Sequence, residues 1–85
     1  MTFTVTAADS VYDALALIYV EASDRKSVRN AADWIEMQLK NDPLSKVTPI
    51  DDLYFLRRCP LVALCKISVD DRLVTIIEIH RIDVP

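Results

Sequence analysis

The last third of the chain alternates between apolar and polar positions and predicts three consecutive strands. Residues 53–58, 61–69 and 72–82 are rich in β-branched and aromatic side chains, with breaks at Cys59-Pro60 and Asp70-Asp71. Asp tolerates positive φ better than most residues other than Gly, so Asp70-Asp71 predicts a two-residue hairpin loop. A shorter alternation over residues 2–6, with Phe3 and Val5 on one side, predicts a further strand near the N-terminus.

Two helical patterns lie between the first strand and the other three. Ser10 followed by Asp13 resembles a capping box and predicts the start of one helix, and Asp24 predicts the N-cap of a second. Asp42-Pro43 ends the second helix near Asn41, because the residue before Pro avoids helical angles. Residues 44–52 are expected to form a loop. Apolar residues recur at helical spacing in both helices, at Val11, Ala14, Leu15, Ile18 and Ala22, and at Val28, Ala31, Ala32, Ile35 and Leu39.

The order β-α-α-β-β-β predicts a single α+β domain over residues 1–85, in which a helical hairpin packs on an antiparallel sheet. The predicted two-residue loop sets the hairpin register, so that Cys65 faces Ile76 and Leu61 faces His80 on the helix side. The opposite face is then only half polar, and an exposed apolar patch of this kind is typical of an interaction site. The alternative is that loop 44–52 or the chain end covers it. The candidate partner-binding residues on this face are Val62, Leu64, Lys66, Leu73, Ile77 and Ile79.

Composition narrows the function classes. The 85 residues are 52% apolar and include no Gly, so one domain has material for a core and its tight turns must use Asp, Asn, Ser or Pro. The formal net charge of −3 argues against non-specific nucleic-acid binding, which rests on neutralising phosphates. No apolar run reaches about 18 residues, and no basic start precedes an apolar stretch. We therefore expect no membrane span, no signal peptide and a cytoplasmic location.

Few residues offer catalytic chemistry. Cys59 and Cys65 are expected to be free thiols, and His80 lies too far along the predicted sheet from Cys65 to form a thiol–imidazole pair. No spaced set of Cys and His suggests a metal site, and no cofactor is expected. Cations could still hold a scissile phosphate and offset its developing charge in metal-free RNA cleavage. The alternative is a solvated sheet edge with scattered charges. The candidate cations are Arg57, Arg58, Lys66 and Arg81.

Several short segments, in this order and spacing, resemble the RelE/ParE toxin superfamily of bacterial toxin–antitoxin systems. They are the junction at residues 22–25 (Ala-Ser-Asp-Arg), the helix end at residues 35–44, the strand start Pro60-Leu61, and residues 70–74 (Asp-Asp-Arg-Leu-Val). The resemblance covers roughly residues 3–81. It implies a helical hairpin on a small curved antiparallel sheet and a role in plasmid stabilisation or related systems.

The resemblance also implies partners. RelE-like proteins cut messenger RNA in the ribosome without a metal, ParE-like proteins inhibit DNA gyrase, and an antitoxin neutralises both. Val62 stands where the nuclease branch usually has Arg, so the resemblance favours binding over catalysis. We expect a toxin-like component of a type II toxin–antitoxin system. The alternatives are an inactive relative that acts as an interaction module or homodimer, and a metal-independent endoribonuclease.

Overall fold

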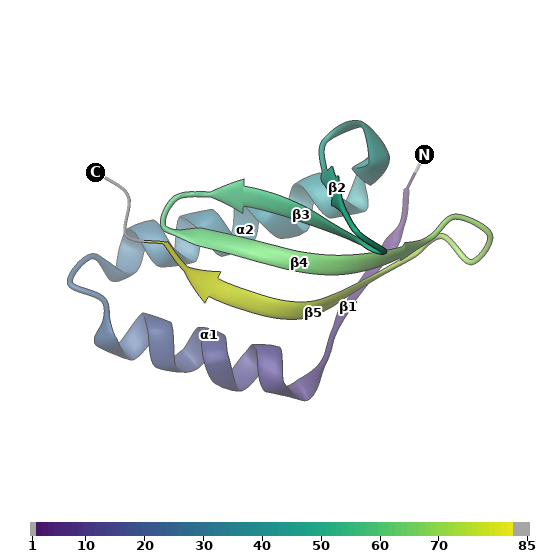
Figure 1. Ribbon diagram of the computed structural model, residues 1–85. Coiled ribbons are helices and arrows are strands. Elements are labelled where there is room, and N and C mark those ends of the chain that lie inside the picture. Colours follow the sequence, from purple (N-terminus) through teal and green to yellow (C-terminus); the bar gives the residue numbers. More distant parts are fainter. Residues whose placement is uncertain (1, 83–85) are drawn as a thin grey trace.

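The protein is built of two layers, with both helices on one face of a five-stranded sheet (Figure 1). The computed structural model describes residues 2–82. The expected α+β architecture is confirmed, with strand order β1-β5-β4-β3-β2 across the sheet. The elements in chain order are β1 (Thr4–Ala7), α1 (Asp9–Glu21), α2 (Arg25–Lys40), a 3₁₀ turn η1 (Pro43–Ser45), β2 (Thr48–Ile50), β3 (Leu53–Arg58), β4 (Leu61–Ser68) and β5 (Leu73–Arg81).

The two helices begin in different ways. Asp24 caps α2 as predicted, since the Ser27 N–H donates to its carboxylate at 3.1 Å and the Ser27 hydroxyl donates to it at 2.7 Å. These bonds lower the pKa of the Asp24 carboxyl. The predicted capping box of α1 is wrong, because α1 starts after Ala8 with no side-chain cap. Its other end is held by Arg25, whose guanidinium donates to the carbonyl oxygens of Tyr19 and Val20 at 3.1 and 3.0 Å.

The sheet is mixed, whereas the sequence predicted an antiparallel one. Strands β3, β4 and β5 form the predicted antiparallel meander, but β1 pairs with β5 in parallel. Strand β2 lies in the segment that was expected to be a loop, and it pairs with the edge of β3. Pro49 occupies its middle position, which an edge strand tolerates because one side needs no backbone donor.

The β4–β5 hairpin turns at Asp70 and Asp71, but its loop has four residues, 69–72, instead of the predicted two. The Arg72 N–H donates to the Val69 carbonyl oxygen at 3.2 Å, and Arg72 takes the positive φ of 49°. A two-residue loop of the common type needs positive φ at both central residues. Without Gly that conformation is costly, and the longer loop needs it at one residue only.

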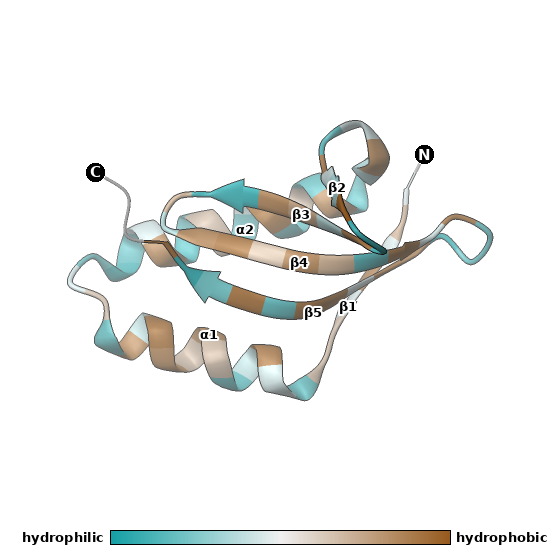
Figure 2. Ribbon diagram, viewed as in Figure 1, coloured by the Kyte–Doolittle hydropathy of each residue, from teal (hydrophilic) through white to brown (hydrophobic). Residues whose placement is uncertain are grey.

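The core lies between the sheet and the helices. Side chains from α2 and the inner sheet face fill it, and the largest of those that are fully buried include Ile35, Leu39, Leu61, Val28 and Val74. Helix α1 contributes only Val11 to the buried set, although Figure 2 shows apolar positions along its whole length. The two helices are therefore packed unequally, and α1 keeps much of its apolar surface outside the core.

Candidate functional site

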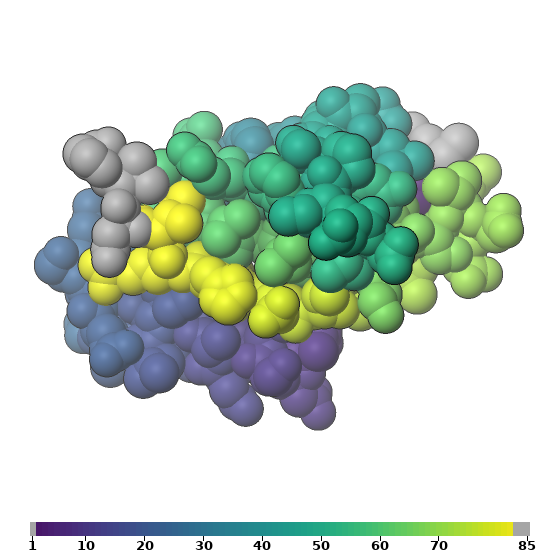
Figure 3. Space-filling view, in the orientation of Figure 1, coloured from purple at the N-terminus to yellow at the C-terminus, as the bar shows by residue number. Residues whose placement is uncertain are grey.

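The sheet face opposite the helices, here called the open face, is the candidate site. Side chains alternate across the paired strands, so one set points to the helices and the other away from them. Figure 3 looks onto this face, where β4 lies in a recess between β5 (yellow) and the segment around β2 (dark teal). Its residues on β3, β4 and β5 are Leu53, Phe55, Arg57, Val62, Leu64, Lys66, Ser68, Leu73, Thr75, Glu78 and His80.

The centre of the open face is apolar. Leu64 on β4 pairs with Phe55 on β3. Val62 lies two residues before Leu64 on the same strand, so its side chain points to the same face. All three side chains are half-buried, although both helices pack on the other side of the sheet. Among the described residues, the segment that comes forward over this side is the one around β2, which narrows the recess without filling it (Figure 3). The predicted apolar patch is therefore present.

A β-bulge changes which β5 residues reach the open face. Cys65 pairs with Ile76 as predicted, but Leu64 pairs with Glu78, so Ile77 is an extra residue in the ladder. Beyond it the side-chain alternation is reversed. Ile79, predicted for the open face, is 7% exposed in the core, and the prediction is wrong for this residue.

Because of the bulge, Glu78 and His80 lie on the open face. Regular alternation would have placed Ile77 and Ile79 there instead. A hairpin without the bulge would aim both polar side chains at the helices, where burying a carboxylate costs several kcal/mol. The sequence does carry a signal for the change. The apolar doublet Ile76-Ile77 interrupts the alternation, and the polar positions then resume one residue out of phase.

The four candidate cations are divided between the two faces. Arg57 pairs with Val62 and Lys66 pairs with Thr75, so both lie on the open face. Arg58 points to the helix side, where its guanidinium carbon lies 5.0 Å from the centre of the Trp34 ring.

Arg81 also belongs to the helix side of the sheet. It pairs with the fully buried Leu61 and lines a separate small pocket with Asp24 and Cys59. The sequence-based set therefore does not form one site.

Charged groups lie at both ends of the apolar centre. Arg57, Val62 and His80 form one row across β3, β4 and β5, which puts the first and last about 10 Å apart at Cα. His80 Nε2 lies 3.5 Å from a carboxylate oxygen of Glu78, and Lys66 lies at the opposite end of the centre. This arrangement suits a polymer that is itself amphipathic, or an anion held between Arg57 and His80.

Other chemistry is sparse in the described part of the chain. Cys59 and Cys65 are both free, as expected; Cys59 is exposed, whereas burial raises the pKa of the Cys65 thiol to about 11. Residues 2–82 contain no group of acidic, Cys or His side chains placed to hold a metal ion. Within the same residues, neither helix has the length and hydropathy needed to cross a membrane.

Comparison with known proteins gives a clear answer for the fold. No family model matches the chain, and no curated protein is similar to it in sequence. The isolated Escherichia coli RelE toxin, in contrast, superposes with a TM-score of 0.59 at 8% identity, over 98% of this chain and 87% of that one. The chain has the RelE/ParE toxin fold.

Two other solved structures are more similar to this RelE/ParE-like chain. The toxin–antitoxin complex RelBE2 from Mycobacterium tuberculosis matches with a TM-score of 0.77 and 16% identity, covering 95% of this chain and 92% of that chain. The chromosomal ParDE toxin–antitoxin system from P. aeruginosa matches with a TM-score of 0.69 and 13% identity, covering 96% and 98%. The expected resemblance is thus confirmed at the level of fold, over almost the whole chain.

Proposed function

We propose that this chain is the toxin-like component of a type II toxin–antitoxin pair, acts in the cytoplasm by binding a cellular target, and is neutralised by an antitoxin that covers the open face. The RelE/ParE fold supports the proposal, and the similar structures include a toxin–antitoxin complex and a toxin–antitoxin system. The fold alone does not fix a function, so the side chains of the open face must support it as well.

The observation that carries the proposal is the apolar centre of the open face with charges at its ends. Phe55, Val62 and Leu64 offer a continuous apolar strip that neither helix covers, and Arg57 and Lys66 lie at its two ends. An amphipathic helix or strand could place apolar side chains on the strip and acidic ones beside the two cations. Central apolar residues within a charged rim are the usual anatomy of such an interface.

The test places a charge at the centre of the strip. Leu64→Asp should weaken antitoxin binding at least about tenfold, since a desolvated central residue carries much of the binding energy. Val69→Asp is the matched control, because Val69 is 52% exposed in the β4–β5 loop, away from the strip. Each variant is co-expressed with the product of the neighbouring gene, and binding is measured by calorimetry on purified proteins.

Growth gives the second measurement. Induction of the wild-type chain alone should slow growth, and co-expression of the neighbouring gene should restore it. Growth that stays normal on induction argues against a toxin. Antitoxin binding that survives Leu64→Asp with its affinity intact would remove the open face from the interface.

A second candidate function is metal-independent RNA cleavage, which one feature of the same face favours. The Glu78–His80 pair at 3.5 Å could move a proton, and Arg57 in the same row as His80 could hold a phosphate. Replacing Arg57 and His80 together with Ala should then abolish RNA cleavage by the purified chain, in the presence of ribosomes and in their absence. Arg58→Ala is the control on the other face and should leave cleavage unchanged. If the variant that lacks both Arg57 and His80 still cleaves RNA at the wild-type rate, this role is excluded.

A further inference from the structure

Helix α1 exposes far more apolar surface than a helix packed on a sheet normally does. Tyr12, Leu17 and Val20 are 60%, 60% and 62% exposed, and Tyr19 is 40% exposed. An amphipathic surface helix would carry polar residues at these outward positions. Tyr12, Tyr19 and Val20 lie on the side of α1 that turns toward α2, and together they offer on the order of 300 Å² of surface, which is the size of patch that is often functional.

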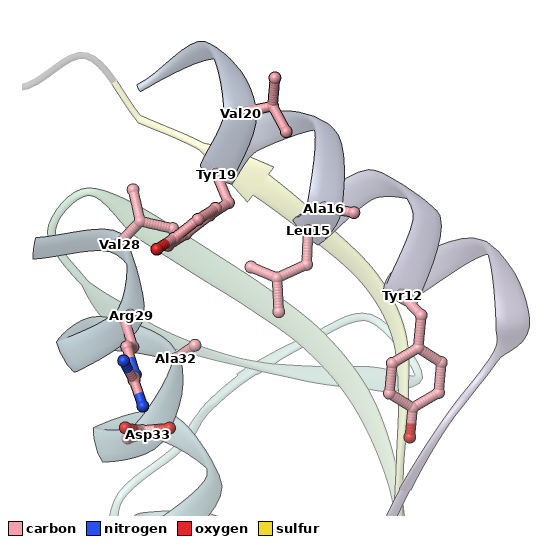
Figure 4. A pocket seen from close by; sticks show the side chains of 9 residues that line it. All are labelled: Tyr12, Leu15, Ala16, Tyr19, Val20, Val28, Arg29, Ala32 and Asp33. Carbon is pink, nitrogen blue, oxygen red and sulfur yellow. The ribbon is translucent and has the colours of Figure 1, made fainter. Parts of the chain in front are cut away.

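Tyr12, Tyr19 and Val20 border a groove between the two helices. Leu17 lies five residues from Tyr12, on the side of α1 that faces away from this groove. The groove has a volume of about 420 Å³ and is lined from the α1 side by Tyr12, Leu15, Ala16, Tyr19 and Val20, and from the α2 side by Val28, Arg29, Ala32 and Asp33. Figure 4 shows the Leu15 and Tyr19 side chains directed toward α2, with Ala32 on the facing helix. The groove lies on the helical layer, so it is separate from the open face of the sheet.

The groove has one acidic end and one basic end. Asp9 and Asp13 lie at the start of α1, next to the later turns of α2, where Glu36 is already paired with Lys40. The other end holds Arg25 and Arg29 in the first turns of α2.

The hydrogen bonds from Arg25 to the last carbonyls of α1 keep that cation at the basic end. Glu21 is also near this end, but it is nine residues from Tyr12, which puts it on the opposite side of α1 from the groove.

We propose that a second copy of this chain docks on this groove, so that the two α1 helices pack antiparallel about a twofold axis. A twofold contact pairs the same surface with itself, and the antiparallel arrangement brings the acidic end of each copy to the basic end of the other. Asp13 of one copy then approaches Arg29 of the other. Ala16 meets its own counterpart near the axis, and Tyr12 of each copy meets Val20 of the other. This goes beyond the proposed function, because antitoxin and second copy use opposite layers of the molecule.

The size of the patch sets the strength of the dimer. The exposed side chains and the groove walls together offer about 400 Å² per copy, which lies at the low end of specific interfaces. Dimerisation should therefore depend on concentration, with a dissociation constant in the micromolar range.

Sedimentation equilibrium from about 1 µM to about 200 µM tests the dimer directly. The wild-type chain should pass from monomer to dimer over this range. Ala16→Glu should stay monomeric because it puts like charges together at the axis, and Val20→Glu should stay monomeric because it places a charge against Tyr12 of the other copy. Met37→Glu is the matched control, since Met37 is 61% exposed on α2 but does not line the groove, and it should dimerise like the wild type. All three sites are exposed, and thermal melts confirm that each variant is folded.

A charge exchange tests the antiparallel pairing. Arg29→Asp should weaken the dimer at least about tenfold, and adding Asp13→Arg should restore it to within about threefold of wild type. A chain that is monomeric at every concentration overturns the proposal, as does a dimer that Leu64→Asp breaks and Ala16→Glu leaves intact. Loss of antitoxin binding in Ala16→Glu would show that the antitoxin occupies the groove, and it also overturns the proposal.

Discussion

The reversed alternation in β5 predicts that Ile79, and not His80, supports the fold. Ile79 is 7% exposed and pairs with Ala63, which is fully buried, so Ile79→Ala removes three buried carbons and leaves a cavity. Truncations of this kind cost about 2–5 kcal/mol, and we expect about 3 kcal/mol because the site lies toward one end of the core. His80 has a side chain that is 56% exposed, so His80→Ala should change stability by less than about 0.5 kcal/mol.

Urea unfolding followed by far-UV circular dichroism measures both free energies. A domain of 85 residues has a total stability of about 4–13 kcal/mol, so a loss of about 3 kcal/mol is a large fraction of it. In thermal melts the same loss should lower Tm by about 12–24 °C. Ile77→Ala, at the half-buried bulge residue, should cost about 1 kcal/mol and serves as the control of equal chemistry. A stable Ile79→Ala together with a destabilised His80→Ala would mean that the bulge does not exist and that the regular register is correct.

The two thiols should differ in reactivity, with Cys59 modified by iodoacetamide in the native protein and Cys65 only after unfolding; equal native rates would contradict the burial of Cys65. Because burial raises the Cys65 pKa to about 11, the unfolded chain loses this proton first as pH rises, so stability should fall between about pH 9 and pH 11. Cys65→Ala should lack that part of the decline in urea unfolding. Arg58→Ala should cost about 0.5–1 kcal/mol through its lost contact with Trp34, and Arg57→Ala, on the open face, should cost less; the reverse order would assign the two residues to the wrong faces.

The strongly periodic elements could be predicted from the sequence almost residue by residue. Strand β3 has the expected bounds, and α2 follows its predicted cap at Asp24. Strand β2 could not be predicted, because three residues with Pro49 in the middle have no period to detect and pair only with an edge. The parallel pairing of β1 with β5 is likewise invisible in a sequence pattern, which gives the faces of a strand but not its neighbour.

The candidate site was predictable only up to the point where the ladder changes phase. Val62, Leu64 and Lys66 lie on the expected face because β4 alternates without interruption. A single extra residue in β5 moves every later side chain to the other face, so the prediction for Ile79 fails although every residue was assigned to the correct strand. Periodicity alone cannot decide where such an insertion falls, but the cost of burying Glu78 can, because only the bulged ladder keeps that carboxylate in solvent.

The cost of exposing apolar side chains to water also bears on why two surfaces of so small a domain remain apolar. Val11 is the only α1 residue in the buried core, and α1 nevertheless exposes Tyr12, Tyr19 and Val20, where neither helix stability nor core packing requires them. Exposed apolar residues on a helix bring no folding energy and increase the risk of aggregation, so their concentration beside a groove with one acidic and one basic end favours a surface that is covered part of the time. The open face, on the other layer of the molecule, likewise has apolar side chains beside charged ones. A chain that folds with two apolar surfaces on opposite layers can bind two partners at once, and the separate variants at Leu64 and Ala16 test the two surfaces one at a time.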